Sequence, residues 1–538
     1  MALRTSIALA LLVGCTRSAV LADPADAGAL PEDAGDAARD LGARPEVCAA
    51  AAAGAPLGIL ALRREGTALH ALHAGGRTSV LHRALEDVAA RGEPTWSGPR
   101  FAPGLQGRPA GEPRVDAPVI AASLVTVEER CGGSRCPRQS ELVLLTPDGI
   151  VSRRLSFPAS FRAPQLTYLT NDGLVGLQVG TEAIGGFSEA RFYDARGAQV
   201  GVLDPGVHFA RDGHAGADGW RAASFSDDAG SGGGFLRFRD GRVETRRPGV
   251  EGSVWRDAWV VWDDAGVHVQ RADSRRTIPL ALDVGGGRRT PQLAWPRSEV
   301  LLLSAGRFLY GLVDLERERA TLFPEPLPHD WSSRADLSVG HGVALVSVDG
   351  APRHRVTLDT GAVVPVALPE GLMPLVAGSC TGRPQPVAGG GFALVLRGED
   401  RTGGYVARGS PPRSLDPVGL RLRDVAFGQV LPAGPLLVVM GSTGRDRFCP
   451  AVEPSDAPAA ADERVGDSVQ IVGADGAQLL APDESVVGYL DPDGACALVG
   501  DPRALDAGLW LRDFTRGEDA EVEGTGWFPV DTLPLFFY

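Results

Sequence analysis

The sequence predicts an all-β fold built from many short strands. Gly and Pro are abundant, with 70 and 41 residues in a chain of 538, which indicates frequent turns. Short runs rich in Val, Leu and Ile recur, and each is followed by a turn signal. No stretch keeps a helical period for more than two or three turns. The runs and their turns are Glu141–Thr146 before 147–149, Gln165–Thr170 before 171–173, Phe235–Arg239 before 240–241, and Val343–Val348 before 349–350.

The turns recur at a regular spacing. Asp148 and Asp172 each precede a glycine, about 24 residues apart, and Arg196 precedes Gly197 about 24 residues further on. Two such turns per unit give a repeat of about 48 residues, near the length of a blade in a β-propeller. At about 48 to 60 residues each, the body would hold about seven or eight four-stranded blades. The alternative is two β-sandwich domains divided near residues 370–420, where Pro and Gly are frequent.

The segment 482–516 resembles the blade repeats of TolB-type and WD40-like β-propellers. In those repeats a strand ends in a Pro-Asp-Gly turn, which here is Pro492-Asp493-Gly494. The next strand is small and apolar, like Ala495–Val499, and a third ends in apolar residues followed by Asp, like Leu509-Trp510-Leu511 with Asp513. The resemblance implies the fold and carries no function with it.

A looser copy of the same pattern spans Pro291–Leu322. Together the copies imply that residues 46–538 form a β-propeller body. A closed ring also explains how many short strands avoid exposed edges. We therefore expect the last apolar run, Phe528–Phe537, to pair with the first blade and close the ring.

The N-terminus carries the pattern of an export signal. Arg4 precedes the apolar run Ile7–Val13, which is too short to span a bilayer. The residues Leu12-Val13-Gly14-Cys15 resemble the lipobox of bacterial lipoproteins, in which the cysteine receives a diacylglyceryl group and signal peptidase II cuts before it. The resemblance implies a signal peptide at residues 1–14 and lipidation of Cys15.

The compartment follows from this signal. Thr16 after the cysteine is similar to the outer-membrane-sorted kind of lipoprotein, so we expect a protein of the cell envelope that is lipid-anchored in the outer membrane. The alternative is cleavage by signal peptidase I after Val20-Leu21-Ala22, which would release a soluble periplasmic or secreted protein. Residues 15–45 are rich in Ala, Asp, Gly and Pro and predict a flexible acidic tether.

The net charge of −14 bears on the partners. Nucleic-acid binding needs clustered cations, so the sequence predicts no nucleic-acid partner. Attraction to anionic lipid is also unfavourable, so membrane attachment should come through the lipid anchor.

Seven cysteines are present, and six remain when Cys15 is set aside as the lipidated residue. Export to an oxidising compartment favours disulfides. Fifteen pairings are possible for six cysteines. The pairing that we favour joins Cys131 to Cys136 across a hairpin loop, Cys380 to Cys449, and Cys48 to Cys496, which would tie the start of the body to its end.

Trp255 and Trp259, with Trp262, form an aromatic cluster in the sequence. Trp255 and Trp259 are the candidate ligand-binding residues, as a platform on which a sugar could stack. If all three residues belong to one strand, 255 and 259 share a face and 262 takes the other. Packing in the core is the alternative.

The sequence indicates no catalytic residues, no metal site and no cofactor. The chain has no Lys, which excludes P-loop and Schiff-base lysines, and it has no Gly-x-Ser-x-Gly elbow. His70 and His73 would face opposite sides of a strand and could not share a metal. The acidic loop His208–Asp218 matches no calcium loop that we can justify. Asp491 and Asp493 are expected to shape a turn.

Two functions from different classes remain open. The first is an envelope-anchored lipoprotein whose β-propeller is a non-catalytic binding or scaffolding module for a protein or glycan. The second is an exported propeller hydrolase or lyase acting on polysaccharide, because paired carboxylates need not be close in sequence. The missing catalytic motifs favour the first.

Overall fold

The computed structural model describes residues 46–531 with interruptions. The longest lie at 106–113, 129–137, 281–291 and 501–507, and between 367 and 478 only the strands are described. Residues 45–538 form one compact unit. Its strands make eight four-stranded antiparallel sheets, and further sheets of five, two and three strands lie between residues 372 and 472.

The first four sheets along the chain follow one pattern, in which strands pair in sequence order. The first sheet holds β1 (Ala61–Glu65), β2 (Ala68–Leu72), β3 (Thr78–Arg83) and the distant β42 (Phe528–Pro529). The second holds β4 (Pro94–Phe101), β5 (Ala121–Glu128), β6 (Arg138–Thr146) and β7 (Gly149–Phe157). The third holds β8 (Gln165–Leu169), β9 (Val175–Gly180), β10 (Phe187–Tyr193) and β11 (Gln199–Leu203). The fourth holds β12 (Val207–Phe209), β13 (Arg221–Asp227), β14 (Gly230–Arg239) and β15 (Arg242–Arg246).

Three more four-stranded sheets continue the series, and an eighth precedes β42. They are β16 (Ser253–Trp255), β17 (Ala258–Asp263), β18 (Gly266–Gln270) and β19 (Arg275–Pro279); β20 (Gln292–Leu293), β21 (Val300–Ala305), β22 (Phe308–Asp314) and β23 (Arg319–Pro328). Next come β24 (Ala335–Gly340), β25 (Val343–Val348), β26 (Ala351–Thr357) and β27 (Ala362–Pro365). The eighth is β38 (Ser485–Leu490), β39 (Cys496–Gly500), β40 (Leu509–Asp513) and β41 (Glu518–Val522).

The region between the seventh and eighth of these sheets holds the remaining strands. The five-stranded sheet is β28 (Leu372–Pro374), β31 (Gln385–Val387), β32 (Gly391–Gly398), β33 (Gly404–Ser410) and β34 (Ser414–Val418). β29 (Val376–Ala377) pairs with β30 (Cys380–Thr381), and β35 (Phe427–Ala433), β36 (Leu436–Ser442) and β37 (Asp467–Val472) form the last sheet. The described helices are short: α1 (Ala49–Gly54), α2 (Glu86–Ala89), and the single turns Pro56–Gly58, Ala74–Gly76 and Pro103–Leu105.

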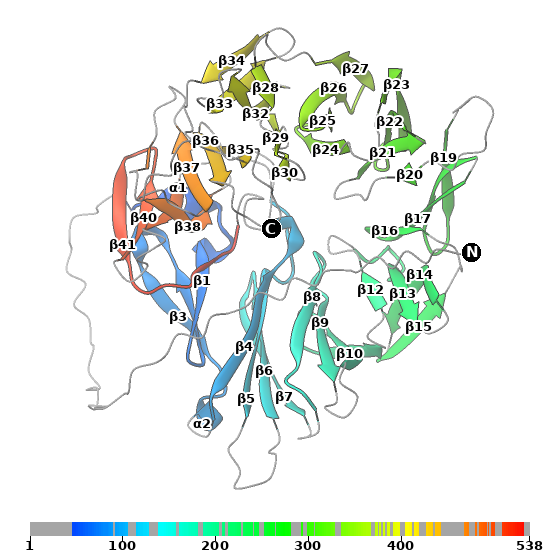
Figure 1. The fold of residues 1–538 in the computed structure, drawn as a ribbon. Helices are drawn as coiled ribbons and strands as arrows, with labels where there is room; N and C mark the ends of the chain where they lie inside the picture. Colours follow the sequence, from blue (N-terminus) through cyan, green and yellow to red (C-terminus); the bar gives the residue numbers. More distant parts are fainter. Residues whose placement is uncertain are drawn as a thin grey trace, which may run out of the picture. The chain divides into compact units, whose positions relative to one another are not determined.

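The predicted β-propeller is confirmed, and two β-sandwiches do not describe this arrangement. Figure 1 shows the sheets arranged around a centre. The first strands of the sheets, such as β8, β12 and β24, lie nearer to this centre, and later strands, such as β10, β15 and β27, lie farther from it. The turns also carry the predicted repeat. The Gly149 turn joins β6 to β7, and the Gly197 turn joins the equivalent strands β10 and β11 of the next sheet. Gly197 and Gly173 have φ of 72° and 80°, which glycine adopts without strain.

The core lies between neighbouring sheets. All residues of β25 and of β39 are buried, so these strands are covered on both faces. One cluster packs Leu142 and Leu144 of β6 against Leu166 and Leu177 of the next sheet. Strands buried on both faces appear in the sequence as continuous apolar runs rather than as an alternating pattern. This explains the form of the runs that predict the fold.

Arginines join two of the outer strands, β19 and β23, to the following sheet. Arg276 of β19 lies 2.8 Å from Glu318 in the turn after β22. Arg319 of β23 donates to the carbonyl of Asp359, in the turn after β26, at 3.1 Å. The guanidinium group suits this role because it presents several donors in a fixed plane.

The ring closes where its first and last parts meet. β42 pairs antiparallel with β1, so that Leu62 lies opposite Phe528, and the prediction of closure by the last apolar run is confirmed for Phe528–Pro529. The N–H of Val530 donates to the carbonyl of Leu60 at 3.0 Å. A disulfide joins Cys48 to Cys496, as predicted, with 5.6 Å between the Cα atoms. The first sheet therefore depends on both ends of the body.

Candidate functional site

Polar side chains link the first four sheets, from β1, which lies next to β42, to the edge strands β4, β8 and β12 of the following sheets. Arg64 of β1 donates to the carbonyl of Gly98 on β4. Arg100 of β4 donates through Nε to the carbonyl of Leu166 on β8, at 2.7 Å. Edge strands leave backbone carbonyls without a partner strand, and these side chains supply the missing donors. The side chains of Arg64 and Arg100, continued by Tyr168 and His208 below, are called the inner-edge residues here.

Tyr168 of β8 continues this series. Its hydroxyl donates to the carbonyl of Val207 on β12 at 3.0 Å, and it lies 2.8 Å from Nδ1 of His208. The phenol has one proton, so when it donates to Val207 the imidazole Nδ1–H donates to the phenol oxygen. His208 is an exposed residue.

The first strands of the second to fifth sheets carry no acidic residue. The strands β4, β8, β12 and β16 contain no Asp or Glu, although the chain carries 67 acidic residues. Burial lowers the pKa of the Arg64 guanidinium, which also lies 4.6 Å from the ring of Phe528. Arg100, Tyr168 and His208 lie on strands without Asp or Glu, whereas Arg64 is followed by Glu65 on β1. An arginine, a phenol and an imidazole on such strands suit a ligand with anionic or hydroxyl groups.

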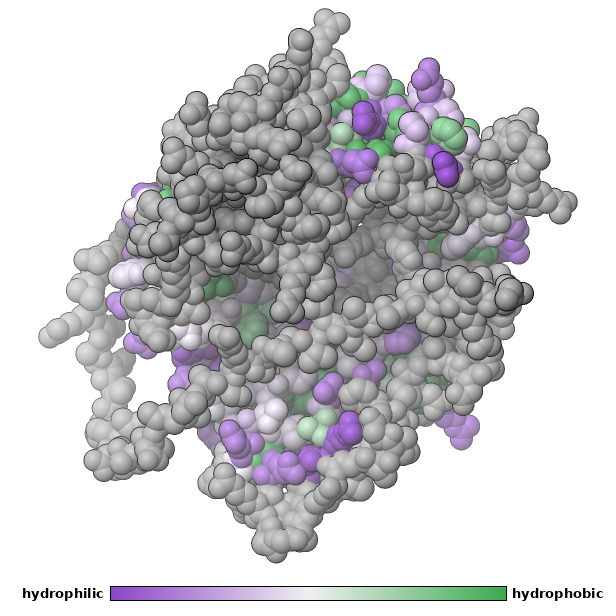
Figure 2. Space-filling view, viewed as in Figure 1, coloured by the Kyte–Doolittle hydropathy of each residue, from purple (hydrophilic) through white to green (hydrophobic). Residues whose placement is uncertain are grey.

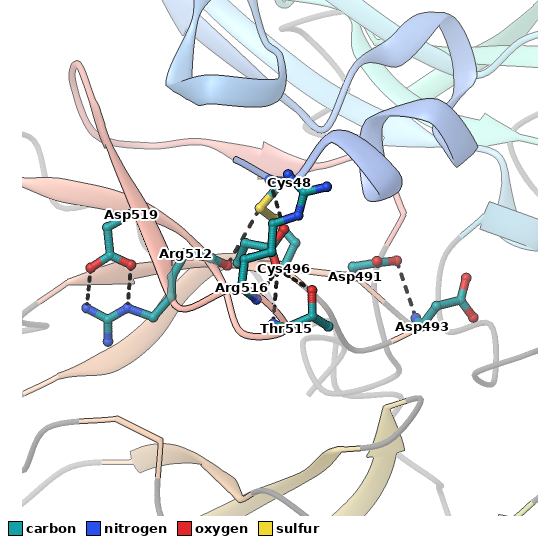
Figure 3. Close-up of a disulfide and its surroundings, with 9 residues drawn as sticks. Cys48, Asp491, Asp493, Cys496, Arg512, Thr515, Arg516 and Asp519 are labelled. Carbon is teal, nitrogen blue, oxygen red and sulfur yellow. Dashed lines mark hydrogen bonds and ion pairs between the residues drawn. A yellow bond between two sulfur atoms is a disulfide. The ribbon is translucent and has the colours of Figure 1, made fainter. Parts of the chain in front are cut away.

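A second group of polar residues lies beside the closure disulfide (Figure 3). The N–H of Asp491 donates to the carbonyl of Cys496 at 2.8 Å, and the N–H of Asp493 lies 3.3 Å from Oδ1 of Asp491. The predicted turn-shaping role of Asp491 is therefore seen in the structure. Burial raises the pKa of Asp491 to about 6, and the charges of Asp493 and Asp531 act in the same direction. The Nε of Arg114 binds Asp531 at 2.5 Å.

Other carboxylates at this place act as caps. Oδ1 of Asp513 accepts hydrogen bonds from the N–H groups of Thr515 and Arg516, at 3.0 and 3.2 Å. The Cys48 N–H lies 3.3 Å from the other oxygen. Figure 3 shows Arg512 bound to Asp519, and hydrogen bonds to Asp519 and Glu484 raise the Arg512 pKa.

The same capping recurs at the ends of third strands. Asp194 after β10 and Asp314 at the end of β22 each accept two backbone N–H bonds from the turn that follows. The aspartate that the propeller resemblance points to is thus a turn cap. Its presence in the sequence is explained by folding.

The two candidate tryptophans are both buried, at 5% exposure for Trp255 and 2% for Trp259. Neither ring offers a face on which a sugar could stack, so a stacking platform here is not consistent with the structure. The expectation that they share a face is also wrong, because a turn through Arg256, with φ of 49°, separates β16 from β17. Trp255 packs toward the sheet of β21 and β22, whereas Trp259 packs against Trp220 and its neighbours.

The histidines flagged in the sequence lie apart. His73 contacts the carbonyl of Gly58 and the hydroxyl of Ser79, at 3.2 and 2.8 Å, while His70 lies 3.6 Å from Glu65. His214 and Asp218 are exposed. Within the described residues, no group of three or more His, Cys, Asp or Glu side chains is arranged to hold a metal ion. None of the helices described has the length and hydropathy needed to cross a bilayer.

Several predicted positions fall where the structure gives no description. Cys15, Cys131, Cys136 and Cys449 lie outside the described residues, as do the tether and the signal segment. Cys380 begins β30, but its side chain is not described. Of the three predicted disulfides, Cys48–Cys496 is thus the pair seen in the described part of the chain.

Sequence reasoning missed the inner-edge residues. Arg100 and Tyr168 carry no local motif, because their partners are 66 and 39 residues away in the chain. The signal that could have found them is the lack of Asp and Glu in a series of strands from an acidic chain.

The sheets and their closure place the chain in the class of β-propeller proteins. No protein-family profile matches the sequence, and no curated protein matches it. Among solved structures, it is similar to AztD from Citrobacter koseri, at 12% identity over 65% of this chain and 91% of that one, with a TM-score of 0.26. It is also similar to the dihydro-heme d1 dehydrogenase NirN, at 15% identity over 69% and 74%, with a TM-score of 0.26.

A third similar structure is the β-propeller domain of the trilobed protease from Pyrococcus furiosus, described as having an open velcro topology. It shares 10% identity over 55% of this chain and 93% of that chain, with a TM-score of 0.22. Similarities at this level say nothing about ligand or activity.

Proposed function

We propose that this chain is a lipid-anchored protein of the bacterial cell envelope whose β-propeller is a non-catalytic binding module for a glycan or a protein. The observation that carries the binding role is the inner edge, where Arg64, Arg100, Tyr168 and His208 follow one another across four sheets. Such residues bind oriented hydroxyl and anionic groups without needing a reactive centre.

Export is supported by the closure disulfide. Cys48 and Cys496 are 1% and 0% exposed and bonded to each other, and structural disulfides persist in oxidising compartments. The lipobox at Cys15 then supplies the anchor, and residues 15–45 supply reach between bilayer and body.

The address is tested by comparing wild type with Cys15→Ser in cell fractionation and by intact mass. Wild type should remain with membranes and carry the mass of a lipid, whereas the variant should appear in the soluble fraction. Membrane retention of the variant, or an unlipidated wild type, would refute the anchor.

The binding role is tested on a glycan array with the Cys15→Ser protein as background. Adding Arg100→Ala or His208→Ala should weaken a glycan signal at least tenfold, because each removes a charged or polar contact. Arg242→Ala is the matched control, since Arg242 is an exposed arginine at the start of the outer strand β15. An equal loss in the control would show that the signal reflects overall charge rather than the inner edge.

Asp491 favours a second candidate, an exported hydrolase or lyase acting on polysaccharide. A buried carboxyl group with a pKa near 6 is suited to general acid or base chemistry. Turnover of a polysaccharide that is lost in Asp491→Asn would support this alternative, and unchanged turnover in that variant would exclude Asp491 as its catalytic group.

A further inference from the structure

Three side chains on the second, third and fourth strands of one sheet form a polar array, and none of them lies on the first strand, β16. Nδ1 of His268, on β18, lies 2.9 Å from the hydroxyl of Thr277 on β19. Nε2 of the same ring lies 2.8 Å from Oδ1 of Asp263, at the end of β17. The register places His268 directly opposite Thr277, so neighbouring strands hold the array in place.

The array is ordered like a nucleophile, a base and an orienting acid. Asp263 also accepts the N–H of Ala265 at 2.8 Å, which fixes its carboxylate at the strand end. A carboxylate at Nε2 favours the tautomer with a proton there, which leaves the Nδ1 lone pair facing the Thr277 hydroxyl. Nε2 of His268 and the Asp263 carboxylate lie within hydrogen-bonding distance, but their geometry is not that of a hydrogen bond. Catalytic hydrogen bonds are often poorly aligned before a substrate binds.

Exposure separates the roles of the three groups. The His268 side chain is 5% exposed, whereas Asp263 is 55% exposed and Thr277 is an exposed residue. Arg275 stands two residues before Thr277, on the same face of β19, and lies 3.9 Å from Oδ2 of Asp263. A guanidinium at that position can stabilise negative charge developing on a carbonyl oxygen beside Thr277.

We propose that Thr277, His268 and Asp263 form a second site, which cleaves small exposed esters such as acetyl groups on sugars. The hydroxyl oxygen of Thr277 bonds to the ester carbonyl carbon while its proton passes to Nδ1 of His268. The C–O bond to the alcohol then breaks, and the alcohol leaves with that proton. Water repeats both steps on the acyl-threonine and releases the carboxylic acid.

The proposal is independent of glycan binding at the inner edge. The reacting hydroxyl of Thr277 lies on β19, an exposed strand at the edge of its sheet, so we expect a small acyl group as the substrate and slow turnover. General-base assistance of this kind is worth about 10²-fold or more.

The test uses the full chain and p-nitrophenyl acetate, with release of nitrophenolate followed by absorbance. Thr277→Val and His268→Gln should lower the rate at least tenfold, and Thr277→Ser should retain it within about threefold. Thr245→Val is the matched control, because Thr245 is an exposed strand residue on β15, and it should hydrolyse as wild type does. Thermal unfolding of each variant separates loss of the reaction from loss of the fold.

Acid-quenched mass spectrometry supplies a second measurement, on the wild-type protein alone. An acetyl group on the peptide containing Thr277 supports the site. Wild-type hydrolysis in Thr277→Val, or acetylation found only elsewhere, would overturn it. A protein that binds no glycan but is acetylated at Thr277 keeps this proposal while losing the inner-edge one.

Discussion

Removing the closure disulfide should lower the stability of the whole body. The bond between Cys48 and Cys496 closes a loop with a sequence separation of 448 residues. In the chain-entropy description, opening so long a loop costs about 6 kcal/mol, and measured disulfide contributions are usually about 2–4 kcal/mol. The strand pairing at this point is short, since β42 contributes Phe528–Pro529 to the first sheet, and an apolar cluster of both ends of the body packs beside the bond. We expect a loss of at least about 2 kcal/mol in Cys48→Ala with Cys496→Ala.

The assay is guanidinium chloride unfolding followed by tryptophan fluorescence, with and without a reductant. Wild type should unfold at lower denaturant concentration when reduced, and its midpoint should approach that of the double variant. The double variant should change less on reduction than wild type does. A double variant whose unfolding free energy stays within 1 kcal/mol of oxidised wild type would refute the reasoning, because the closure would then rest on noncovalent contacts.

Three further outcomes follow from individual residues. The pKa of Asp491 is raised to about 6, so the protonated carboxyl group stabilises the fold at low pH, and this contribution is lost as the pH rises through 6. The variant Asp491→Asn should therefore stabilise the protein by up to about 3 kcal/mol above pH 7 and should change its stability little near pH 4. Thermal unfolding of both proteins across this pH range measures the difference. Burial opposes ionisation of Glu141, but hydrogen bonds hold its pKa below the usual value. Glu141→Gln should therefore lower the free energy of unfolding by about 1–3 kcal/mol at pH 7, and by less as the pH falls. A loss of stability that does not depend on pH would contradict this prediction. Gly233→Ala would place a Cβ within 1.8 Å of the Trp259 ring and should cost about 1–3 kcal/mol, whereas Gly232→Ala meets nothing within 4 Å and is the matched control; equal midpoints in denaturant would show that the ring moves aside freely.

The fold was accessible from the sequence because its strands are local. The run Val343–Val348 is predicted residue for residue as β25, since a strand covered on both faces is a continuous apolar segment ended by a turn. The Cys48–Cys496 pair is one of the pairings open to six cysteines, and the expectation that a ring joins its two ends favours it. Both inferences use information that a single chain carries.

The site was less accessible because its contacts are between sheets. Arg100 donates a hydrogen bond to the carbonyl of Leu166, and no local sequence pattern at either residue predicts this contact. The side of the sheet on which a tryptophan lies also depends on where its strand ends. The turn at Arg256 ends β16, so Trp259 packs in a different apolar cluster from Trp255. Turn geometry at a non-glycine residue is poorly encoded in composition, so this error is of a kind that strand periodicity alone does not correct.

The pairing of β1 with β42 sets an order of events during biosynthesis. Ala61 and Leu62 emerge from the ribosome long before Phe528 and Pro529 do. Until β42 is synthesised, the edge of β1 in the first sheet has no partner strand, whereas every other described sheet can form from residues that are near in sequence. Contacts between such distant residues form late and slowly, and an open strand edge invites pairing with the wrong chain. The chain is thus exposed to misassembly and to chaperone or protease action until its last segment arrives.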